Sequence, residues 1–272
     1  MRIIEGKTIK KAVEALLEEL GYQIDSNYLK RIKNRIKEID DSLEKEILKD
    51  FVKNATVSKN NKMPLCQDTG VVSCFVEIGD QVHINGNLNN IINKAVKNVY
   101  LKEQYRLSIV NDPFERKNTL DNTPASISID FVKGESLKIM LMLKGGGSEN
   151  VSFFKPLLPT NTEDDVIAEI KNYIAKIGAK ACPPYLLGVA IGGDFVTATK
   201  EAKKALFKDF SRNTKFEEKI INAVNELNIG AIGSGGITCL GANVKLLPTH
   251  IASCFLAVSV CCNAVRKKVI RL

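Results

Sequence analysis

The chain has 272 residues, of which 44% are hydrophobic and 26% charged, values that are ordinary for a globular protein and exclude extensive disorder. No apolar run reaches the roughly 18–20 residues that cross a bilayer, and the N-terminal segment alternates charged with apolar side chains, unlike a signal peptide. The net charge of +8 comes from Lys and Arg spread along the chain, without aromatic stacking motifs. We therefore expect a cytoplasmic protein that binds neither membranes nor nucleic acid.

In chain order, the first sixty residues are predicted to be mostly helical. Apolar positions recur at helical spacing over residues 7–21, where the pattern stops at Gly21, and on one stripe over residues 27–53. A β-branched run predicts a strand over residues 71–79, and residues 89–105 are predicted to form a helix. Alternation around Gly134 indicates a hairpin whose second strand runs into three glycines.

The second half of the chain continues with alternating elements. Helices are predicted over residues 163–177 and 200–228, and residues 181–194 combine a loop, a buried strand and a glycine turn. The C-terminal segment alternates loops and strands. Because we find no internal repeat and no composition break, we expect a single domain, residues 1–272, of mixed α/β class with mixed sheets surrounded by helices.

The seven cysteines are an odd number without secretory context, which argues against a disulfide framework. No pair has the C-x-x-C spacing of a zinc ribbon or the clustered run of a ferredoxin. A bound metal would therefore take its ligands from loops that are far apart in the sequence.

The segment NKMPLCQDTG, residues 61–70, places Cys66, Gln67 and Asp68 side by side between a proline and a glycine. Two polar side chains after a cysteine, followed by Thr-Gly, suit neither a helix nor a strand interior. We predict a loop that presents these three side chains.

Four further segments are ambiguous when each is taken alone. KGGGSEN (144–150) can bring backbone N–H groups close to an anionic ligand or form a simple turn, and ACPPY (181–185) is a rigid turn as readily as a ligand site. DPFERKNTLDNTPA (112–125) is either a functional loop or solvated surface. His250, just before an apolar strand, is equally consistent with a structural and a chemical role, whereas His83 lies in a strand pattern and is interpreted as structural.

Together these segments resemble a known family. MPLCQDTG, DPFERKNTLDNTPA, KGGGSEN, ACPPY followed by IGG, and PTHIASCFLAVSVCCNAVR occur in the order and approximate spacing of the iron–sulfur class I fumarate hydratases and L(+)-tartrate dehydratases. The resemblance extends from about residue 8 to the C-terminus. Five segments in one order are far more specific than any one of them.

The resemblance implies a [4Fe–4S] cluster held by loops through Cys66, Cys182 and Cys262, with one iron that has no protein ligand and acts as a Lewis acid. Cys262 is assigned because it lies twelve residues after His250, as in the family. Cys239 and Cys254 correspond to positions where family members vary and are interpreted as packing thiols. Cys261 and Asn263, on either side of Cys262, depart from the commoner family pattern.

The same resemblance assigns roles to other positions. Asp68 and His250 become candidate catalytic residues. Arg106 matches an arginine that binds a substrate carboxylate, which suits a planar guanidinium. The implied substrate is a small dicarboxylate, and the candidate substrate-binding residues are Gln67, Arg106, Gly145, Gly146, Gly147, Ser148 and Glu149.

Single-chain members of the family continue into a further C-terminal domain, whereas this chain ends at Leu272. We therefore expect the alpha subunit of an enzyme that also needs a beta subunit, as an α2β2 heterotetramer, with the proton-abstracting base on the beta subunit. The implied reaction is reversible hydration of fumarate to L-malate; the alternative is dehydration of L(+)-tartrate to oxaloacetate. No residue decides between these substrates or mesaconate. A non-enzymatic iron–sulfur or zinc protein that uses the same thiols is the remaining alternative.

Overall fold

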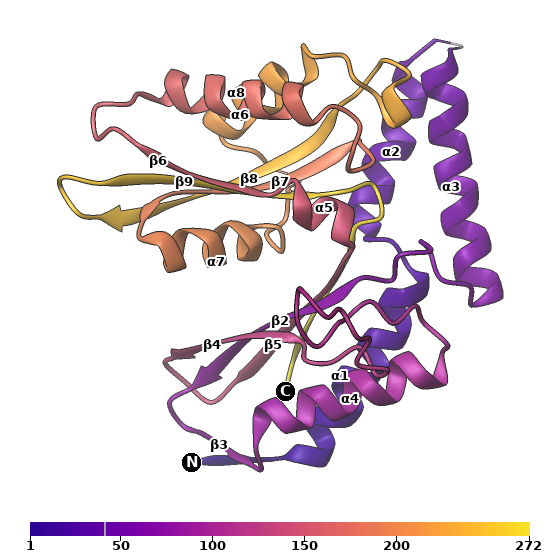
Figure 1. Ribbon diagram of the computed structural model, residues 1–272, viewed down its shortest axis with the longest axis vertical. Helices are drawn as coiled ribbons and strands as arrows, with labels where there is room; N and C mark the ends of the chain where they lie inside the picture. Colours follow the sequence, from indigo (N-terminus) through magenta and orange to yellow (C-terminus); the bar gives the residue numbers. More distant parts are fainter. Residues whose placement is uncertain (41, 211) are drawn as a thin grey trace. The chain divides into compact units, whose positions relative to one another are not determined.

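The computed structural model describes residues 1–40, 42–210 and 212–272, and its fold class is mixed α/β, as predicted (Figure 1). The chain forms two compact units, each built from separate stretches of sequence. Unit 1 contains Met1–Asp25, Asn54–Gly146 and Arg266–Leu272, and unit 2 contains Ser26–Lys53 and Gly147–Val265. The single domain over residues 1–272 stays a prediction, because two compact units can belong to one domain. Among the described residues, no helix is both long and apolar enough to cross a membrane.

Unit 1 combines a four-stranded sheet, in the order β10-β5-β2-β4, with a parallel pair of β1 and β3. Helices α1 and α4 pack on one another, and α1 also contacts β5 and β10 (Figure 1). The apolar positions of both helices lie in one core with β2 and β5, as their helical spacing predicts. The elements are β1 (Arg2–Glu5), α1 (Gly6–Tyr22), β2 (Val71–Gly79), β3 (Val82–Asn85), α4 (Leu88–Lys102), β4 (Ser126–Val132), β5 (Leu137–Lys144) and β10 (Arg266–Arg271).

The predicted hairpin around Gly134 is wrong. β4 and β5 do not pair with each other, because β2 lies between them, parallel to β4 and antiparallel to β5. The connecting turn closes over the end of β2, where Gly79 donates from its N–H to the carbonyl of Ser136 at 2.9 Å. A Cβ on Gly79 would lie 2.2 Å from the carbonyl oxygen of Gly134, so glycine is required for this approach.

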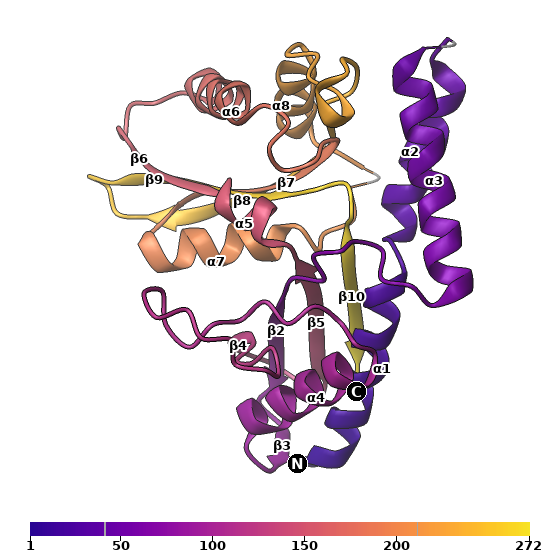
Figure 2. The same ribbon diagram turned by 45° about the vertical axis from the view of Figure 1, so that its right-hand side comes forward.

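Unit 2 is a four-stranded sheet, in the order β6-β9-β7-β8, with helices on both faces. α6 and α8 cover one face and α7 the other (Figure 2). The elements are α2 (Ser26–Glu38), α3 (Leu43–Asn61, which continues beyond the boundary of the unit), α5 (Gly146–Asn150), β6 (Phe153–Leu157), α6 (Glu163–Ile177), β7 (Tyr185–Gly193), α7 (Phe195–Ala205), α8 (Lys215–Asn225), the 3₁₀ turn η1 (Ala231–Gly233), β8 (Cys239–Thr249) and β9 (Cys254–Cys261).

Most predicted elements are confirmed, and the differences have local causes. The first sixty residues are mostly helical, but the stripe over residues 27–53 is divided between α2 and α3, and the pattern over residues 200–228 between α7 and α8. α8 starts anew because Thr214 and Glu217 form a capping box. Asp41 and Ser211, within these two patterns, lie outside the described residues. KGGGSEN, predicted as a loop, contains the short helix α5.

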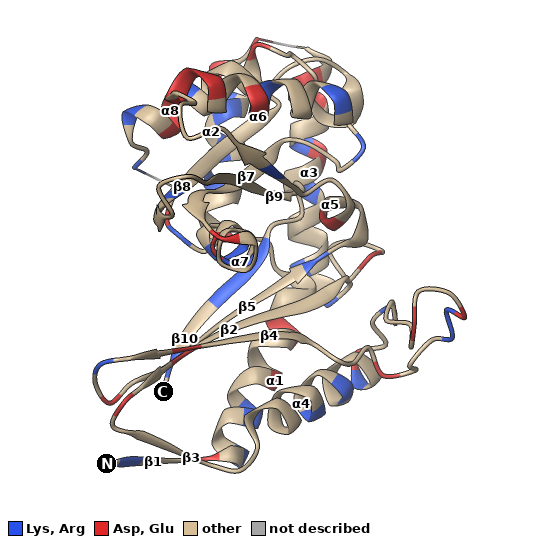
Figure 3. Ribbon diagram, turned by 60° about the vertical axis from the view of Figure 1, so that its left-hand side comes forward, with Lys and Arg blue, Asp and Glu red and all other residues tan. Residues whose placement is uncertain are grey.

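Charged residues are distributed unevenly among the helices. α6 and α8 carry both acidic and basic residues, whereas α4 carries only basic ones (Figure 3). No concentrated basic tail accompanies the net charge of +8, which agrees with a solvated, lysine-rich surface.

Glu217 provides a test of the packing of unit 2. Its carboxylate is 1% exposed and accepts hydrogen bonds from the N–H of Thr214 at 2.7 Å and of Val244 at 2.8 Å, and from Nζ of Lys208 at 3.0 Å. Burial alone would raise the pKa of Glu217, but these hydrogen bonds and the Lys208 charge outweigh it, so the pKa is lowered. The stabilisation is therefore present above the ordinary pKa of a glutamate and is lost as the pH falls through the lowered value.

We predict that Glu217→Gln lowers the free energy of unfolding by about 1.5–3 kcal/mol at pH 7, because a hydrogen-bonded buried charge is removed. The loss should shrink on acidification, and urea unfolding at neutral and acidic pH measures both effects. Glu218→Gln, an exposed neighbour on α8, is the matched control. Equal unfolding free energies for the two variants would contradict this role of Glu217.

Candidate active site

The cysteine loop, residues 62–70, connects the end of α3 to the start of β2 in unit 1, as the sequence predicts. Its last residue, Gly70, is buried and has φ +86°, and a Cβ there would lie 2.4 Å from the carbonyl oxygen of Lys144. The Gly70 carbonyl accepts hydrogen bonds from the hydroxyl of Tyr100 at 2.9 Å and from Nδ2 of Asn122 at 3.2 Å. The loop is therefore anchored firmly where it enters β2.

Asp68 lies beside the glycine segment. The N–H of Gly146 donates to Oδ2 of Asp68 at 2.8 Å, and a Cβ on Gly145 would lie 2.9 Å from the same oxygen. Cys66 and Asp68 are half-buried, and Gln67 is exposed. Two predicted segments, separated by 78 residues, thus meet at one carboxylate.

Arg106 is exposed and belongs to the long segment between α4 and β4. This segment is held at its far end by Asn122, which is 0% exposed and accepts a hydrogen bond from the N–H of Ser108 at 2.7 Å while donating to Gly70. Its tip is a turn in which Asp112 accepts from the N–H groups of Phe114 and Glu115 at 2.7 and 2.9 Å. Arg106 is therefore connected to the cysteine loop through an ordered segment, with its own side chain in solvent.

The rest of the glycine segment belongs to unit 2. Ser148 is 2% exposed, and its carbonyl accepts a hydrogen bond from Oγ of Ser152 at 3.1 Å. Glu149 forms an ion pair with Lys203 of α7. A Cβ on Gly147 would lie 3.9 Å from the carbonyl oxygen of Lys180, so this segment borders the loop that contains Cys182. Ser148 and Glu149 thus both contact other residues of unit 2.

Cys182 and Cys262 lie at the same end of the sheet in unit 2. The carbonyl of Cys182 accepts a hydrogen bond from the N–H of Asn263 at 2.9 Å, and Nδ2 of Asn263 donates to the carbonyl of Pro183 at 3.2 Å. Burial raises the pKa of the Tyr185 hydroxyl to about 12, and the thiols of Cys182 and Cys262 contribute to the rise. Cys182 is exposed with φ +55°, and Cys262 is half-buried.

Three of the four remaining cysteines are more buried than the three predicted ligands, and the fourth, Cys254, is not. Cys74 and Cys239 are 0% exposed, and burial raises the pKa of each thiol to about 12. Cys261 is 1% exposed, whereas Cys254 is half-buried. No disulfide joins any of the seven cysteines in the structure. Inert, buried thiols suit packing, as predicted for Cys239.

His250 does not join the thiols of unit 2. It lies exposed in the turn between β8 and β9, where Nδ1 accepts a hydrogen bond from the N–H of Ala252 at 3.1 Å. β9 spans eight residues between this turn and Cys262, which is roughly 25 Å of extended chain. His250 is therefore beyond reach of Cys182 and Cys262 within its own chain.

The predicted ligand set is divided between the two units. Cys66 belongs to unit 1, and Cys182 and Cys262 belong to unit 2. No group of three or more His, Cys, Asp or Glu side chains among the described residues is arranged to hold a metal ion. The donor chemistry nevertheless fits an iron–sulfur cluster, because the three thiols lie on loops, are at least partly exposed, and two of them share one end of a sheet.

Sequence reasoning missed two buried groups that hold these loops. Tyr28 of α2 is 0% exposed and donates its hydroxyl to the carbonyl of Pro184 at 2.5 Å; burial and the thiol of Cys262 raise its pKa. In unit 1, Nη2 of Arg266 donates to the carbonyl of Asp68 at 3.0 Å. Tyr28 belongs to an apolar helical stripe and Arg266 to a basic strand, so neither pattern indicated such a contact.

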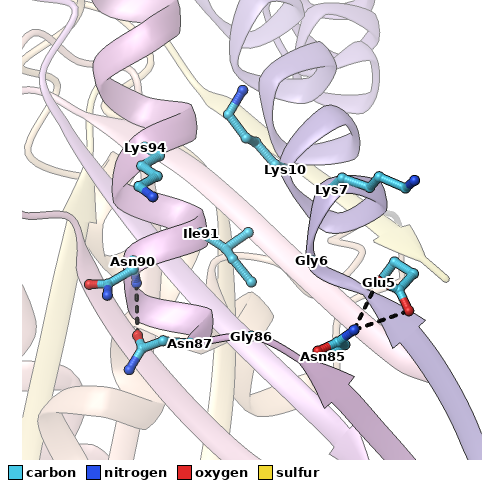
Figure 4. Close-up of a pocket in the computed structure, with 10 residues that line it drawn as sticks. All are labelled: Glu5, Gly6, Lys7, Lys10, Asn85, Gly86, Asn87, Asn90, Ile91 and Lys94. Atoms are coloured by element: carbon cyan, nitrogen blue, oxygen red, sulfur yellow. Dashed lines mark hydrogen bonds between the residues drawn. The ribbon is translucent and has the colours of Figure 1, made fainter.

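A pocket of ≈ 500 Å³ in unit 1 is lined by the first turns of α1 and α4 (Figure 4). In this view Lys7 points away from Lys94 and Lys10 points upward, so the three ammonium groups do not converge. Glu5 accepts hydrogen bonds from Nδ2 of Asn85 at 3.3 and 3.1 Å. None of the predicted site residues lines this pocket, which is therefore separate from the cysteine loop.

Comparison with known proteins identifies relatives over most of the chain. Residues 10–271 match the family described as fumarate hydratase (Fumerase). A protein of Methanocaldococcus jannaschii, provisionally named L(+)-tartrate dehydratase subunit alpha, is 29% identical over 97% of each chain. The anaerobic class I fumarate hydratase of Escherichia coli K12 is 28% identical over 82% of this chain and 44% of its own length. An L(+)-tartrate dehydratase subunit alpha from another E. coli strain is 28% identical over 77% of this chain and 72% of its own.

These matches differ in how much of each relative they cover. The chain spans nearly all of the M. jannaschii protein but less than half of the E. coli fumarate hydratase. The family match covers far more than half of the chain and includes all five segments noted in the sequence. The chain belongs to the class I fumarate hydratase family of hydro-lyases, together with the alpha subunits of tartrate dehydratases.

Proposed function

We propose that this chain is the alpha subunit of a [4Fe–4S]-dependent hydro-lyase that hydrates fumarate reversibly to L-malate. The observation that carries the proposal is the placement of Asp68: its carboxylate is oriented by the N–H of Gly146, two residues after a half-buried cysteine, on a loop anchored at Gly70. Family membership supports the reaction class.

Cys66, Cys182 and Cys262 are the residues that would hold the cluster. When bound, its iron without a protein ligand would supply a Lewis acid for the carboxylate and hydroxyl of a 2-hydroxy acid.

The chain's own side chains can perform the remaining tasks. Oδ2 of Asp68 accepts from Gly146, and the carboxylate is proposed to hold a proton at the substrate hydroxyl. Gln67 and Arg106, both exposed, are suited to bind carboxylate oxygens. His250 as a catalytic group stays a proposal; the length of β9 places it outside the reach of the thiols in its own chain.

L(+)-tartrate is the second candidate substrate. The relative that matches over 97% of both chains is named as a tartrate dehydratase alpha subunit, and a second relative has the same printed function. Tartrate differs from malate by one hydroxyl, so both fit the proposed roles of Asp68, Gln67 and Arg106. The choice depends on whether the site offers that hydroxyl a hydrogen bond, which can discriminate substrates strongly.

A beta subunit is the proposed partner, because two relatives are named alpha subunits and the matched fumarate hydratase extends well beyond this chain. We propose that the beta subunit provides the base that removes the C3 proton, and that the two chains form a cytoplasmic α2β2 enzyme.

The test is an anaerobic assay of the cluster-loaded alpha chain, alone and with its beta subunit, against malate, fumarate, both tartrates and mesaconate. We expect little turnover by the alpha chain alone and turnover of malate and fumarate by the pair, because a divided site needs groups from both chains. Preference for L(+)-tartrate would select the second substrate. Iron binding without turnover of any of these acids would favour the non-enzymatic alternative, and full activity of the alpha chain alone would overturn the division into subunits.

We predict that Cys66→Ser, Cys182→Ser and Cys262→Ser each abolish cluster retention, because a weaker hydroxyl ligand replaces a thiolate. Iron and sulfide analysis should give about four irons per chain in the wild type, as a [4Fe–4S] cluster requires. Cys239→Ser and Cys254→Ser are the controls and should retain the metal. Iron loss in Cys254→Ser with retention in Cys262→Ser would reassign the third ligand.

We predict that Asp68→Asn retains the cluster but lowers kcat by about 10²–10⁴, the usual contribution of a positioned acid or base. Asparagine can still accept the hydrogen bond from Gly146, so the loop should persist. Steady-state kinetics and visible absorption of the αβ complex measure the two effects. Asp164→Asn, on the surface of α6, is the control, and a normal rate for Asp68→Asn would reduce Asp68 to a turn residue.

A further inference from the structure

Arg266, the first residue of β10, is a buried cation that the proposed reaction does not use. It is 1% exposed, and its backbone pairs with Leu143 of β5. Its side chain extends toward the cysteine loop, where Nη2 donates to the carbonyl of Asp68 at 3.0 Å. The buried hydroxyl of Tyr100 donates to the carbonyl of Gly70, two residues after Asp68, at 2.9 Å.

The contact bridges two strands of the sheet. β5 lies between β10 and β2, and Asp68 lies three residues before the start of β2. Two strand spacings amount to roughly 10 Å, a span that a long side chain such as arginine is suited to bridge. Arg266 therefore connects one edge of the sheet to the loop that enters its centre.

This arrangement is costly. Nε and Nη1 of Arg266 are buried and have no hydrogen-bond partner among the described residues. A buried charge with unsatisfied donors destabilises a fold, and an apolar residue of similar length would fill the same space without that cost. A strand that needed only packing at this position would not require a guanidinium.

We propose that Arg266 is a positioning residue: from β10 it fixes the backbone of the loop that carries Cys66, Gln67 and Asp68. Its bond is to the main-chain carbonyl of Asp68, so the carboxylate remains available for Gly146 and for substrate. The significance of this loop rests on the proposed function, whereas the contact itself is independent of it.

Hydrogen exchange of the full-length, metal-free chain tests the proposal. In Arg266→Met, the amides of residues 63–70 should exchange about tenfold to a hundredfold faster, because a hydrogen bond from a charged donor to the loop is lost. Peptides from β7 should not change, and the melting temperature separates a local from a global effect. Arg271→Met, the same substitution at an exposed position of β10, should leave the loop unchanged. Unchanged loop exchange in folded Arg266→Met would overturn the proposal.

A second variant and an NMR measurement also test the role of Arg266. If Arg266→Met does not fold, Arg266→Lys is measured in its place. The lysine side chain is shorter, so the amides of residues 63–70 should again exchange faster than in the wild type. Unchanged exchange of these amides in Arg266→Lys would overturn the proposal. In the wild type, the Arg266 side-chain N–H signals should exchange slowly by NMR, and rapid exchange would contradict a fixed guanidinium.

The rate at which the cluster is lost links the role of Arg266 to the proposed function. In loaded chains treated with an iron chelator, visible absorption should decay faster in Arg266→Met than in the wild type or Arg271→Met, because a loosened loop holds Cys66 less firmly. Equal decay rates would overturn the positioning role. If the wild type takes up no iron, the proposed function fails, while the exchange and NMR measurements still decide the role of Arg266.

Discussion

The close approach of backbone to backbone at Gly70 determines how the cysteine loop is held. A side chain at Gly70 would collide with the Lys144 carbonyl, and the φ of +86° disfavours other residues. This approach allows the Gly70 carbonyl to meet the Tyr100 hydroxyl and the Asn122 amide. α4, β5 and the polar segment before β4 are therefore connected at one residue, two positions after Asp68.

The fold was predictable where a pattern has one physical interpretation. α1 and α4 follow from apolar residues at helical spacing, and β2 follows from a β-branched run bounded by glycine. The hairpin was not predictable, because alternation specifies the face of a strand but not its neighbour: β2 lies between β4 and β5 through contacts distant in sequence. The break between α7 and α8 depends on the Thr214 cap, a short-range signal inside a continuing apolar pattern.

The candidate site was also predictable only in part. The loop character of Cys66, Gln67 and Asp68 follows from composition, but the contact of Asp68 with Gly146 depends on the register of β5 against β2, which pairs Lys144 with Val71. Arg266 belongs to RKKVIR, a sequence that indicates a solvated basic strand, yet it is 1% exposed. When a charged residue is buried by a hydrogen bond to a residue far away in the sequence, its neighbours in the sequence look the same as those of a surface residue.

The charges near Asp68 bear on how a dicarboxylate would be bound. Lys144 and Arg266, two basic residues of unit 1 that border the glycine segment and the cysteine loop, are 3% and 1% exposed, and Arg266 donates to a main-chain carbonyl. Buried cations with such partners contribute to the local field but cannot form a bidentate pair with an incoming carboxylate without leaving the core. Arg106 is exposed and can bind one carboxylate. Under the proposed function, a cation of the proposed beta subunit would bind the second carboxylate.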